Sequence, residues 1–298
     1  VGTVILQSIE KFGVTKLDAS TLEGFKDIPI AAASFIVGAF LSRLGYRNGM
    51  MVGLVLVAIA CITMATFDNF GTTQILFATI GLSFALVKVS VYSLVGLLAD
   101  SPRAHASLLN TIEGIFMIGV LAGYWVFAAF IDRAGSGWLA VYWWLAAVAI
   151  LAAILVATTR FDESRARSSD ELSASPTMIA ELAAMVRLAK RTLTIAFVAT
   201  AFLYVLIEQG IGTWLPTLNR EGFGLSATLS VQAASIFAAG LAAGRLGAGL
   251  LVQKTGWLRL LIGCVAMMAL LLLVVLPLAS QASGAAVTDW ADAPVAVF

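Results

Sequence analysis

Long apolar runs constrain this chain more than any other feature of its sequence. Eight runs are long enough to cross a membrane, and short charged segments separate them. A transmembrane helix needs about 20 mainly apolar residues, whereas a strand of a membrane barrel needs about 10 residues of alternating polarity. Because these runs do not alternate, we predict an all-α, multi-pass membrane protein. The predicted spans lie near 27–41 (extended back into the preceding loop), 49–66, 73–98, 106–131, 138–158, 193–215, 225–251 and 260–279.

The composition agrees with many spans rather than one anchor. Of the 298 residues, 60% are hydrophobic and 12% are charged, against about 25% charged residues in a soluble domain. A net charge of +1 gives no basic surface for nucleic acid, so the lipid bilayer is the expected large partner. Cys61 and Cys264 lie in separate apolar runs, which argues against a structural disulfide. With His105 as the single histidine, the sequence offers no metal site, and we expect no cofactor.

The Lys and Arg residues predict the orientation of the spans. If 1–9 is the end of an earlier span, twelve of the 18 cations lie on one side, five lie on the other, and Lys88 lies inside a span. Cytoplasmic loops are enriched in Lys and Arg, so the side with twelve is predicted to be cytoplasmic. We expect the protein in the cell (cytoplasmic or inner) membrane, with a later span beginning at 294–298.

The longest charged segment, 161–191, is predicted to be a cytoplasmic linker. From Ser175 and Pro176 onward it carries apolar residues at helical spacing. Ser before Pro is typical of a helix start, which predicts a short amphipathic helix on the membrane surface. A flexible tether is the alternative. Either structure would divide the chain into 1–160 and 192–298.

One short pattern occurs twice, at the ends of two predicted spans. It consists of a glycine, a cation, a second glycine and an aromatic residue at identical spacing. The two copies comprise Gly38, Arg43, Gly45 and Tyr46, and Gly249, Lys254, Gly256 and Trp257. The offset is 211 residues, and both copies fall on the predicted cytoplasmic side. This arrangement predicts a parallel repeat of six spans, as in transporters whose halves are related by an axis along the membrane normal.

The first copy resembles the signature loop of the major facilitator superfamily, glycine-x-x-x-aspartate-arginine-x-glycine-arginine. Gly38, Arg43, Gly45 and Arg47 carry the resemblance, while Ser42 stands in place of the acid. The resemblance implies a bundle of two pseudo-symmetric six-helix halves, of which the sequence lacks most of span one and spans ten to twelve. It also implies that the four matching residues form a cytoplasmic gating motif. We expect the carrier to be a monomer.

A weaker resemblance points to the fucose–galactose–glucose symporter branch of that superfamily. It rests on 202–214 and on the pair Gly244-Arg245. That branch has a carboxylate in the middle of span four, where this chain has Lys88. Sugar–proton symport is therefore not implied.

Charged side chains inside spans are the strongest candidates for function, because each costs on the order of 3 kcal/mol to insert. Lys88 lies in the fourth span and Glu113 in the fifth, at similar depths, and we predict that they lie within about 6 Å of each other. The pair is either permanent and structural, or it opens to accept an anion or a proton. The other candidates for substrate binding or coupling are Tyr92, Asn110, Glu208, Gln209 and Trp214.

Helical spacing groups the candidates into stripes. Phe84, Lys88 and Tyr92 share one face, Asn110, Glu113 and Met117 share a second, and Tyr204 and Glu208 share a third. Two expectations concern packing. The glycine pairs Gly119/Gly123 and Gly240/Gly244 predict close helix seams, and Trp138, Tyr142, Trp143 and Trp144 predict an aromatic belt at the membrane interface.

Together these features predict a secondary active transporter for a small polar solute: a sugar, a sugar acid or an organic anion. Protons or sodium would be the coupling ion. A drug or metabolite efflux carrier is an alternative within transport. A membrane-embedded enzyme is an alternative of another class, but it would need a catalytic cluster that a single histidine does not favour.

Overall fold

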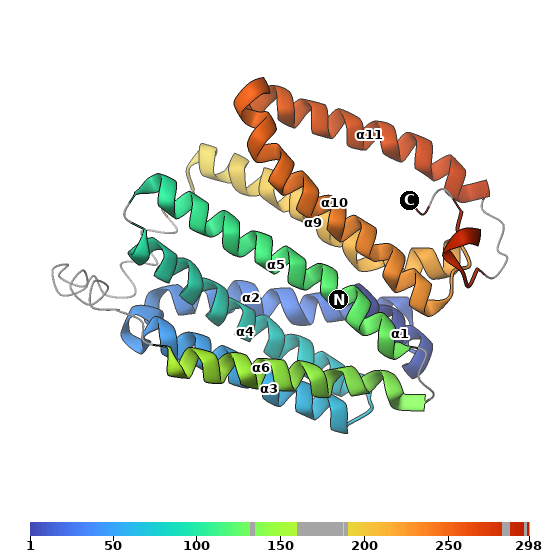
Figure 1. Ribbon diagram of the computed structural model, residues 1–298, viewed down its shortest axis with the longest axis horizontal. Helices are drawn as coiled ribbons and strands as arrows, with labels where there is room; N and C mark the ends of the chain where they lie inside the picture. The colour runs from blue at the N-terminus through green and yellow to red at the C-terminus, as the bar shows by residue number, and fades with distance from the viewer. Residues whose placement is uncertain are drawn as a thin grey trace. The chain divides into compact units, whose positions relative to one another are not determined.

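The computed structural model is built of long helices (Figure 1), and it describes residues 1–99, 101–131, 135–159, 187, 190–281, 287–294 and 297. The helices are α1 Gly2–Phe12, α2 Lys16–Leu44, α3 Tyr46–Thr66, α4 Phe70–Leu98, α5 Pro102–Ile131, α6 Ala140–Thr158, α9 Thr192–Gly222, α10 Ala227–Thr255 and α11 Trp257–Gln281. Two short 3-10 helices, Gly135–Leu139 and Trp290–Asp292, complete the described elements. The all-α prediction is confirmed for this part of the chain.

Each predicted span coincides with a long helix. Among the described residues, the parts of seven helices that are long and apolar enough to cross a membrane are Tyr46–Thr66, Phe70–Leu98, Ser107–Ile131, Gly137–Thr158, Thr192–Gly222, Ala227–Arg245 and Leu258–Val275. The remaining predicted span, 27–41, forms most of the second half of α2. The helix α1 contains the predicted end of an earlier span. The surface helix predicted after Ser175 lies outside the described residues, apart from Arg187, and so does most of 294–298.

The structure carries the predicted repeat in its backbone. Among the residues that the structure describes, four glycines have positive φ angles: Gly13 (64°) and Gly224 (70°), and Gly45 (87°) and Gly256 (78°). The members of each pair are 211 residues apart. The first residues of α2 and α10 are also 211 residues apart, and so are their last residues. The helix starts match as well, since Thr15 accepts a hydrogen bond from the amide of Asp18 and Ser226 accepts one from the amide of Leu229. The two copies therefore share their turns and caps, not only a sequence pattern.

The chain forms two compact units. The first unit contains Val1–Gln7, Thr111–Trp138 and Gly210–Phe298, and the second contains Ser8–Asn110 and Leu139–Gln209. In the first unit, Leu6 of α1 packs with Ala128 and Ile131 of α5 and Val231 of α10. The predicted division into 1–160, 161–191 and 192–298 stays a prediction.

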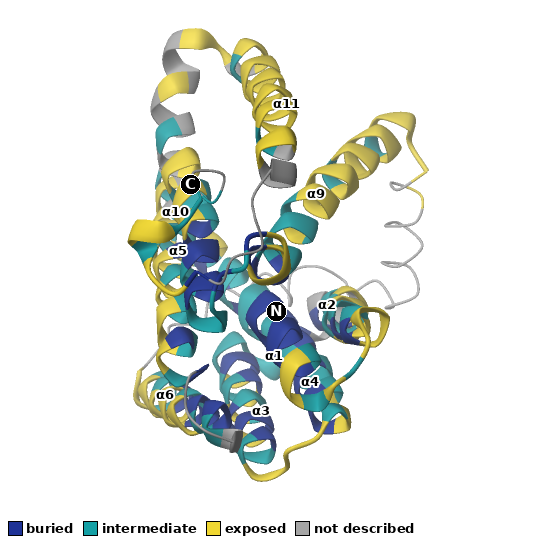
Figure 2. Ribbon diagram, turned by 90° about the vertical axis from the view of Figure 1, so that its right-hand side faces the viewer, coloured by how far each residue is buried: buried dark blue, intermediate teal, exposed yellow. Residues whose placement is uncertain are grey.

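In the second unit, α4 packs against both α2 and α3, and α3 also packs against α6. Ala33, Val37 and Leu41 of α2 meet Ala85 and Leu86 of α4 in one buried cluster. Figure 2 shows buried faces on α3 and α4, whereas α11 of the first unit is exposed along most of its length.

Glycines allow the closest approaches in the second unit. A Cβ at Gly81 of α4 would collide with the backbone carbonyl of Lys26 in α2, and it would lie 3.2 Å from Cβ of Pro29. A backbone atom cannot turn aside as a flexible side chain can. Glycine at this position therefore fixes the distance between α2 and α4.

We expect Gly81→Ala to lower the stability of the folded protein by about 1–3 kcal/mol, because it overpacks this contact. The measurement is the melting temperature of the detergent-purified protein. Gly96→Ala is the matched control on the same helix, since a Cβ there would come no closer than 3.9 Å, to the His105 ring. It should be neutral or stabilise by up to about 1 kcal/mol, because Ala favours helix. Equal melting temperatures for the two variants would contradict the packing argument.

Two packing predictions are wrong. Among the described residues of the first unit, the glycine pairs Gly119/Gly123 and Gly240/Gly244 form no close seam, since a Cβ at any of them would meet nothing within 4 Å. The aromatic belt is only half correct: Trp143 and Trp144 are exposed, but Trp138 and Tyr142 are both 2% exposed and belong to the core. Helical spacing identifies a face of a helix, but it does not say what that face meets.

Candidate functional site

The ammonium group of Lys88 in α4 contacts two aromatic rings of the same helix. The ammonium nitrogen of Lys88 is 5.3 Å from the centroid of the Phe84 ring and 5.2 Å from the centroid of the Tyr92 ring. The spacing of four residues places one ring a turn before the lysine and the other a turn after it. Each such cation–π contact contributes about 0.5–2 kcal/mol, depending on how far it is desolvated. The predicted stripe is confirmed, and Lys88 is half-buried within it.

An ion pair joins α5 to α10 within the first unit. Nη1 of Arg245 lies 3.5 Å from Oε2 of Glu113 and 3.0 Å from the sulfur of Met117. Glu113 is eleven residues from the start of α5 and Arg245 is ten residues from the end of α10, so both lie about 15–17 Å from the predicted cytoplasmic ends. The side chains of Arg245 and Glu113 are 43% and 31% exposed, respectively. The ion pair is therefore partly accessible to solvent, and the two side chains can separate without exposing the hydrophobic core.

Sequence analysis missed Arg245 as the partner of Glu113. The predicted span 225–251 contains Arg245, but Lys88 was the partner predicted for Glu113. The signal that was available is the shared face of Glu113 and Met117, because both side chains contact Arg245. Lys88 belongs to the other compact unit, so its predicted pairing with Glu113 stays a prediction.

The remaining candidates lie on α5 and α9. Glu208 and Trp214 are half-buried, whereas Gln209 and Tyr204 are exposed. The side chain of Asn110 lies outside the described residues. These positions are compatible with a polar face along α9, and their predicted role is untested.

α1 and α9 make a close contact within the first unit. A Cβ at Gly2 would lie 2.5 Å from the carbonyl oxygen of Thr213. Gly2 and Thr213 are 211 residues apart, so they occupy the same position of the repeat. Two equivalent positions can touch only beside the pseudo-twofold axis that relates them. Thr3 and Gln7 of α1 and Thr217 of α9 are also buried.

The predicted gating motif lies around the junction of α2 and α3. Gly45 provides the positive φ that ends one helix and starts the next. Arg47 donates hydrogen bonds to the last carbonyl groups of α6, from Nε to Val156 at 3.2 Å and from Nη2 to Ala157. A cation is favourable at this end of a helix, where carbonyl groups lack partners within the helix. The side chain of Arg43 lies outside the described residues, and Gly38 lies within α2.

We expect Arg47→Ala to destabilise the protein by about 1.5–3 kcal/mol, because two carbonyl groups at the end of α6 lose a charged donor. The measurement is the melting temperature of the purified protein. Arg47→Lys should recover part of the loss, since an ammonium keeps the charge but not the fork of donors. Asn48→Ala is the control, because Asn48 bonds only within its own turn, to the carbonyl of Leu44 at 2.9 Å. A melting temperature for Arg47→Ala equal to that of the control would show that the cap adds no stability.

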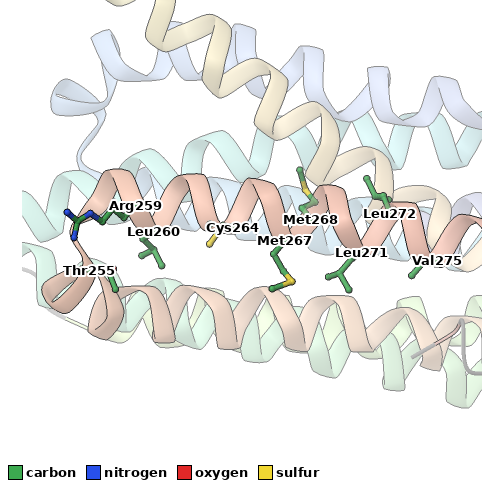
Figure 3. Close-up of a pocket in the computed structure, with 10 residues that line it drawn as sticks. Thr255, Arg259, Leu260, Cys264, Met267, Met268, Leu271, Leu272 and Val275 are labelled. Carbon is green, nitrogen blue, oxygen red and sulfur yellow. The ribbon is translucent and has the colours of Figure 1, made fainter.

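A cavity of about 830 Å³ follows α11 and is open on one side (Figure 3). Its wall is apolar except for Thr255 and Arg259 at one end. A shift of 211 residues toward the N-terminus places five of the lining residues on α3 residues that are all buried. The corresponding pairs are Leu260 and Gly49, Cys264 and Gly53, Leu271 and Ala60, Leu272 and Cys61, and Val275 and Met64. In the first copy of the repeat this face packs against protein. The same correspondence argues that the face on α11 is a helix-packing surface and not the site of a polar solute.

Comparison with known proteins agrees with this architecture. The family model of the Major Facilitator Superfamily matches residues 2–296. No curated protein matches the chain, and no solved structure matches it. The match covers nearly the whole chain, including both copies of the repeat and the long helices that carry Lys88, Glu113 and Arg245. The chain therefore belongs to the major facilitator superfamily and is a membrane transporter of the major facilitator type.

Proposed function

We propose that this transporter moves a small anionic solute across the cytoplasmic membrane by alternating access, coupled to a proton or sodium ion. The observation that carries the proposal is the Lys88 ammonium held between two aromatic rings in the middle of a membrane-spanning helix. A charge at that depth is costly and usually serves a substrate or ion pathway. An anion that binds there gains the attraction of the half-buried Lys88 ammonium group.

Roles follow for the other candidates. Lys88 and Tyr92 contact the solute, and Glu208, Gln209 and Trp214 of α9 complete the binding face from the second half, with Asn110 on α5. The halves 1–160 and 192–298 rock about the site, joined by 161–191, and the carrier acts as a monomer. Gly38, Arg43, Gly45 and Arg47 hold the cytoplasmic ends of the first half together.

Glu113 and Arg245 supply the coupling step. In the proposal, Arg245 neutralises Glu113 in one state, and a proton or sodium ion neutralises it in the other. An ion pair with this exposure contributes about 0–1 kcal/mol to stability. Replacing Arg245 by a proton or sodium ion as the partner of Glu113 therefore costs little free energy. The exchange releases α5 from α10 and links the movement of the ion to that of the solute.

Uptake by the full-length carrier in proteoliposomes tests the proposal. The panel contains radiolabelled neutral sugars, sugar acids and other organic acids, each with and without an inward proton or sodium gradient. We expect saturable uptake of at least one anion, accelerated by one of the gradients. Saturable uptake of neutral sugars alone would overturn the anion assignment, and solute movement only in the outward direction would favour the efflux alternative.

A further inference from the structure

Residues 287–293, which follow α11, lie against the turn between α9 and α10. We call this segment the strap, and we infer that it keeps α10 and α11 together as one body while the carrier changes conformation. This role does not depend on whether the solute is anionic or neutral. The contacts that support it all lie within the first unit.

Main-chain hydrogen bonds pair the strap with the turn. The amide of Ser226 donates to the carbonyl of Val287 at 2.8 Å, and the amide of Val287 donates to the carbonyl of Gly224 at 2.9 Å. These two bonds form a parallel β-bridge between Leu225 and Val287. Because Leu225 precedes α10 and Val287 follows α11, the bridge closes a loop of chain that contains both helices.

An apolar cluster fills the contact between the strap and the turn. Val287 of the strap is 8% exposed, and four residues of the turn and α10 are each no more than 3% exposed: Phe223, Leu225, Leu229 and Ala233. Trp290 and Ala293 of the strap pack against the same cluster. Detaching the strap would return these apolar surfaces to water, which is unfavourable. The closed position is therefore the stable one.

The two helices fix the turn to which the strap binds. The carbonyl of Leu225 accepts hydrogen bonds from Nη1 of Arg220 in α9 at 2.9 Å and from the hydroxyl of Ser230 in α10 at 3.3 Å. The amide of Leu225 donates to the carbonyl of Asn219 at 3.2 Å. The main chain on either side of Leu225 is thus held in place for pairing with the strap.

The strap attaches the open end of the α10–α11 hairpin. The two helices contain 29 and 25 residues, so they are about 43 and 38 Å long, and Gly256 connects them at one end. The strap attaches the chain again at the other end. Because α11 is exposed along most of its length (Figure 2), these two end attachments decide how closely α11 follows α10.

The repeat shows what the strap replaces. A shift of 211 residues toward the N-terminus places α10 and α11 on α2 and α3, and the strap on 76–82 of α4, a helix that packs against both α2 and α3. The apolar contact is specific to the second copy, since the counterpart of the buried Leu229 is the exposed Asp18. In the second copy the strap therefore provides a connection that a whole helix provides in the first.

Labelling at Leu225, which is 0% exposed, tests whether the strap covers the turn. Leu225→Cys is introduced into the detergent-purified full-length carrier with its native cysteines replaced, and the rate of reaction with a maleimide is measured. Val287→Pro removes the amide that bonds Gly224, and we expect it to raise this rate at least about tenfold by freeing the strap. Val14→Cys, at the same position of the first copy, is the matched control and should label at the same rate with or without Val287→Pro. Equal rates at Leu225→Cys with and without Val287→Pro would overturn the inference.

A crosslink tests whether the strap stays closed during transport. Neighbouring strands lie about 4.8 Å apart, which a disulfide can span, so Leu225→Cys and Val287→Cys together should form a disulfide on oxidation. We expect the crosslinked carrier in proteoliposomes to take up the solutes of the panel described above at rates within about twofold of the reduced carrier, because the strap moves as part of a rigid body. The oxidised single-cysteine variants are the controls.

The outcomes separate the strap from the proposed function. Failure to form the disulfide would contradict the bridge. Uptake that falls at least about tenfold on oxidation and returns on reduction would show that the strap must open, and would overturn the inference while leaving transport standing. Uptake of neutral sugars alone, unaffected by the crosslink, would overturn the anion assignment and support the strap.

Discussion

Replacing Lys88 by glutamine in the full-length carrier should abolish saturable anion uptake and saturable anion binding. The substitution keeps a polar side chain of similar length but removes the charge. Loss of the charged partner of a bound anion costs about 2–5 kcal/mol, which corresponds to an affinity at least about thirtyfold weaker. The measurements are initial uptake rates in proteoliposomes and equilibrium binding by scintillation proximity.

Two further variants make this result specific. Lys88→Arg should retain measurable binding, because it keeps the charge and can stack on the flanking rings. Lys26→Gln removes a different cation, which pairs with the adjacent Asp27 at 3.2 Å, and should transport normally. Normal transport by Lys88→Gln, with expression equal to that of the parent, would remove Lys88 from the site.

Replacing Glu113 by glutamine should spare solute binding but abolish accumulation against a gradient. The amide is similar in shape but cannot exchange Arg245 for a coupling ion, so downhill exchange continues while uphill transport stops. We expect a loss of at least tenfold in accumulation, with binding affinity within about twofold of the parent. Equal loss of binding in Glu113→Gln and Lys88→Gln would favour a purely structural role for the charges.

Exchange of the two charges tests the ion pair itself. Glu113→Arg places two cations together and Arg245→Glu places two carboxylates together, so each single variant should exchange solute slowly. The double variant restores opposite charges across the 3.5 Å contact and should recover most of the exchange rate. A double variant that is no better than the worse single variant would show that α5 and α10 do not communicate through this pair.

The sequence predicted the features that depend on one helix at a time. The apolar runs predicted the long helices, and the pattern that contains Gly45 and Gly256 predicted a repeat, in which both glycines have positive φ angles. The stripe of Phe84, Lys88 and Tyr92 was also predictable, because four-residue spacing alone places the rings beside the ammonium group. In each case the determining contacts lie within one helix or one turn.

Features that depend on which helices meet were not predictable from the sequence. The spacing of Gly119 and Gly123 identifies a smooth helix face, yet no described residue lies within 4 Å of a Cβ placed at either glycine. The close approaches use Gly81 and Gly2, which lie opposite a backbone carbonyl of another helix. Arg245 was missed for the same reason, because its partner Glu113 lies 132 positions away in the sequence. Periodicity gives the direction of a side chain, but the tertiary fold supplies its partner.

Reciprocal accessibility at two positions tests alternating access most directly. Thr217 is buried on α9, and Thr111 is exposed on α5, nine residues from the start of that helix. In full-length protein with Cys61 and Cys264 replaced, a cysteine is placed at one position or the other and labelled with a maleimide. We predict that saturating solute changes the two labelling rates in opposite directions, one rising at least about threefold while the other falls. Rates that change in the same direction, or do not change although the solute binds, would contradict transport by alternating access.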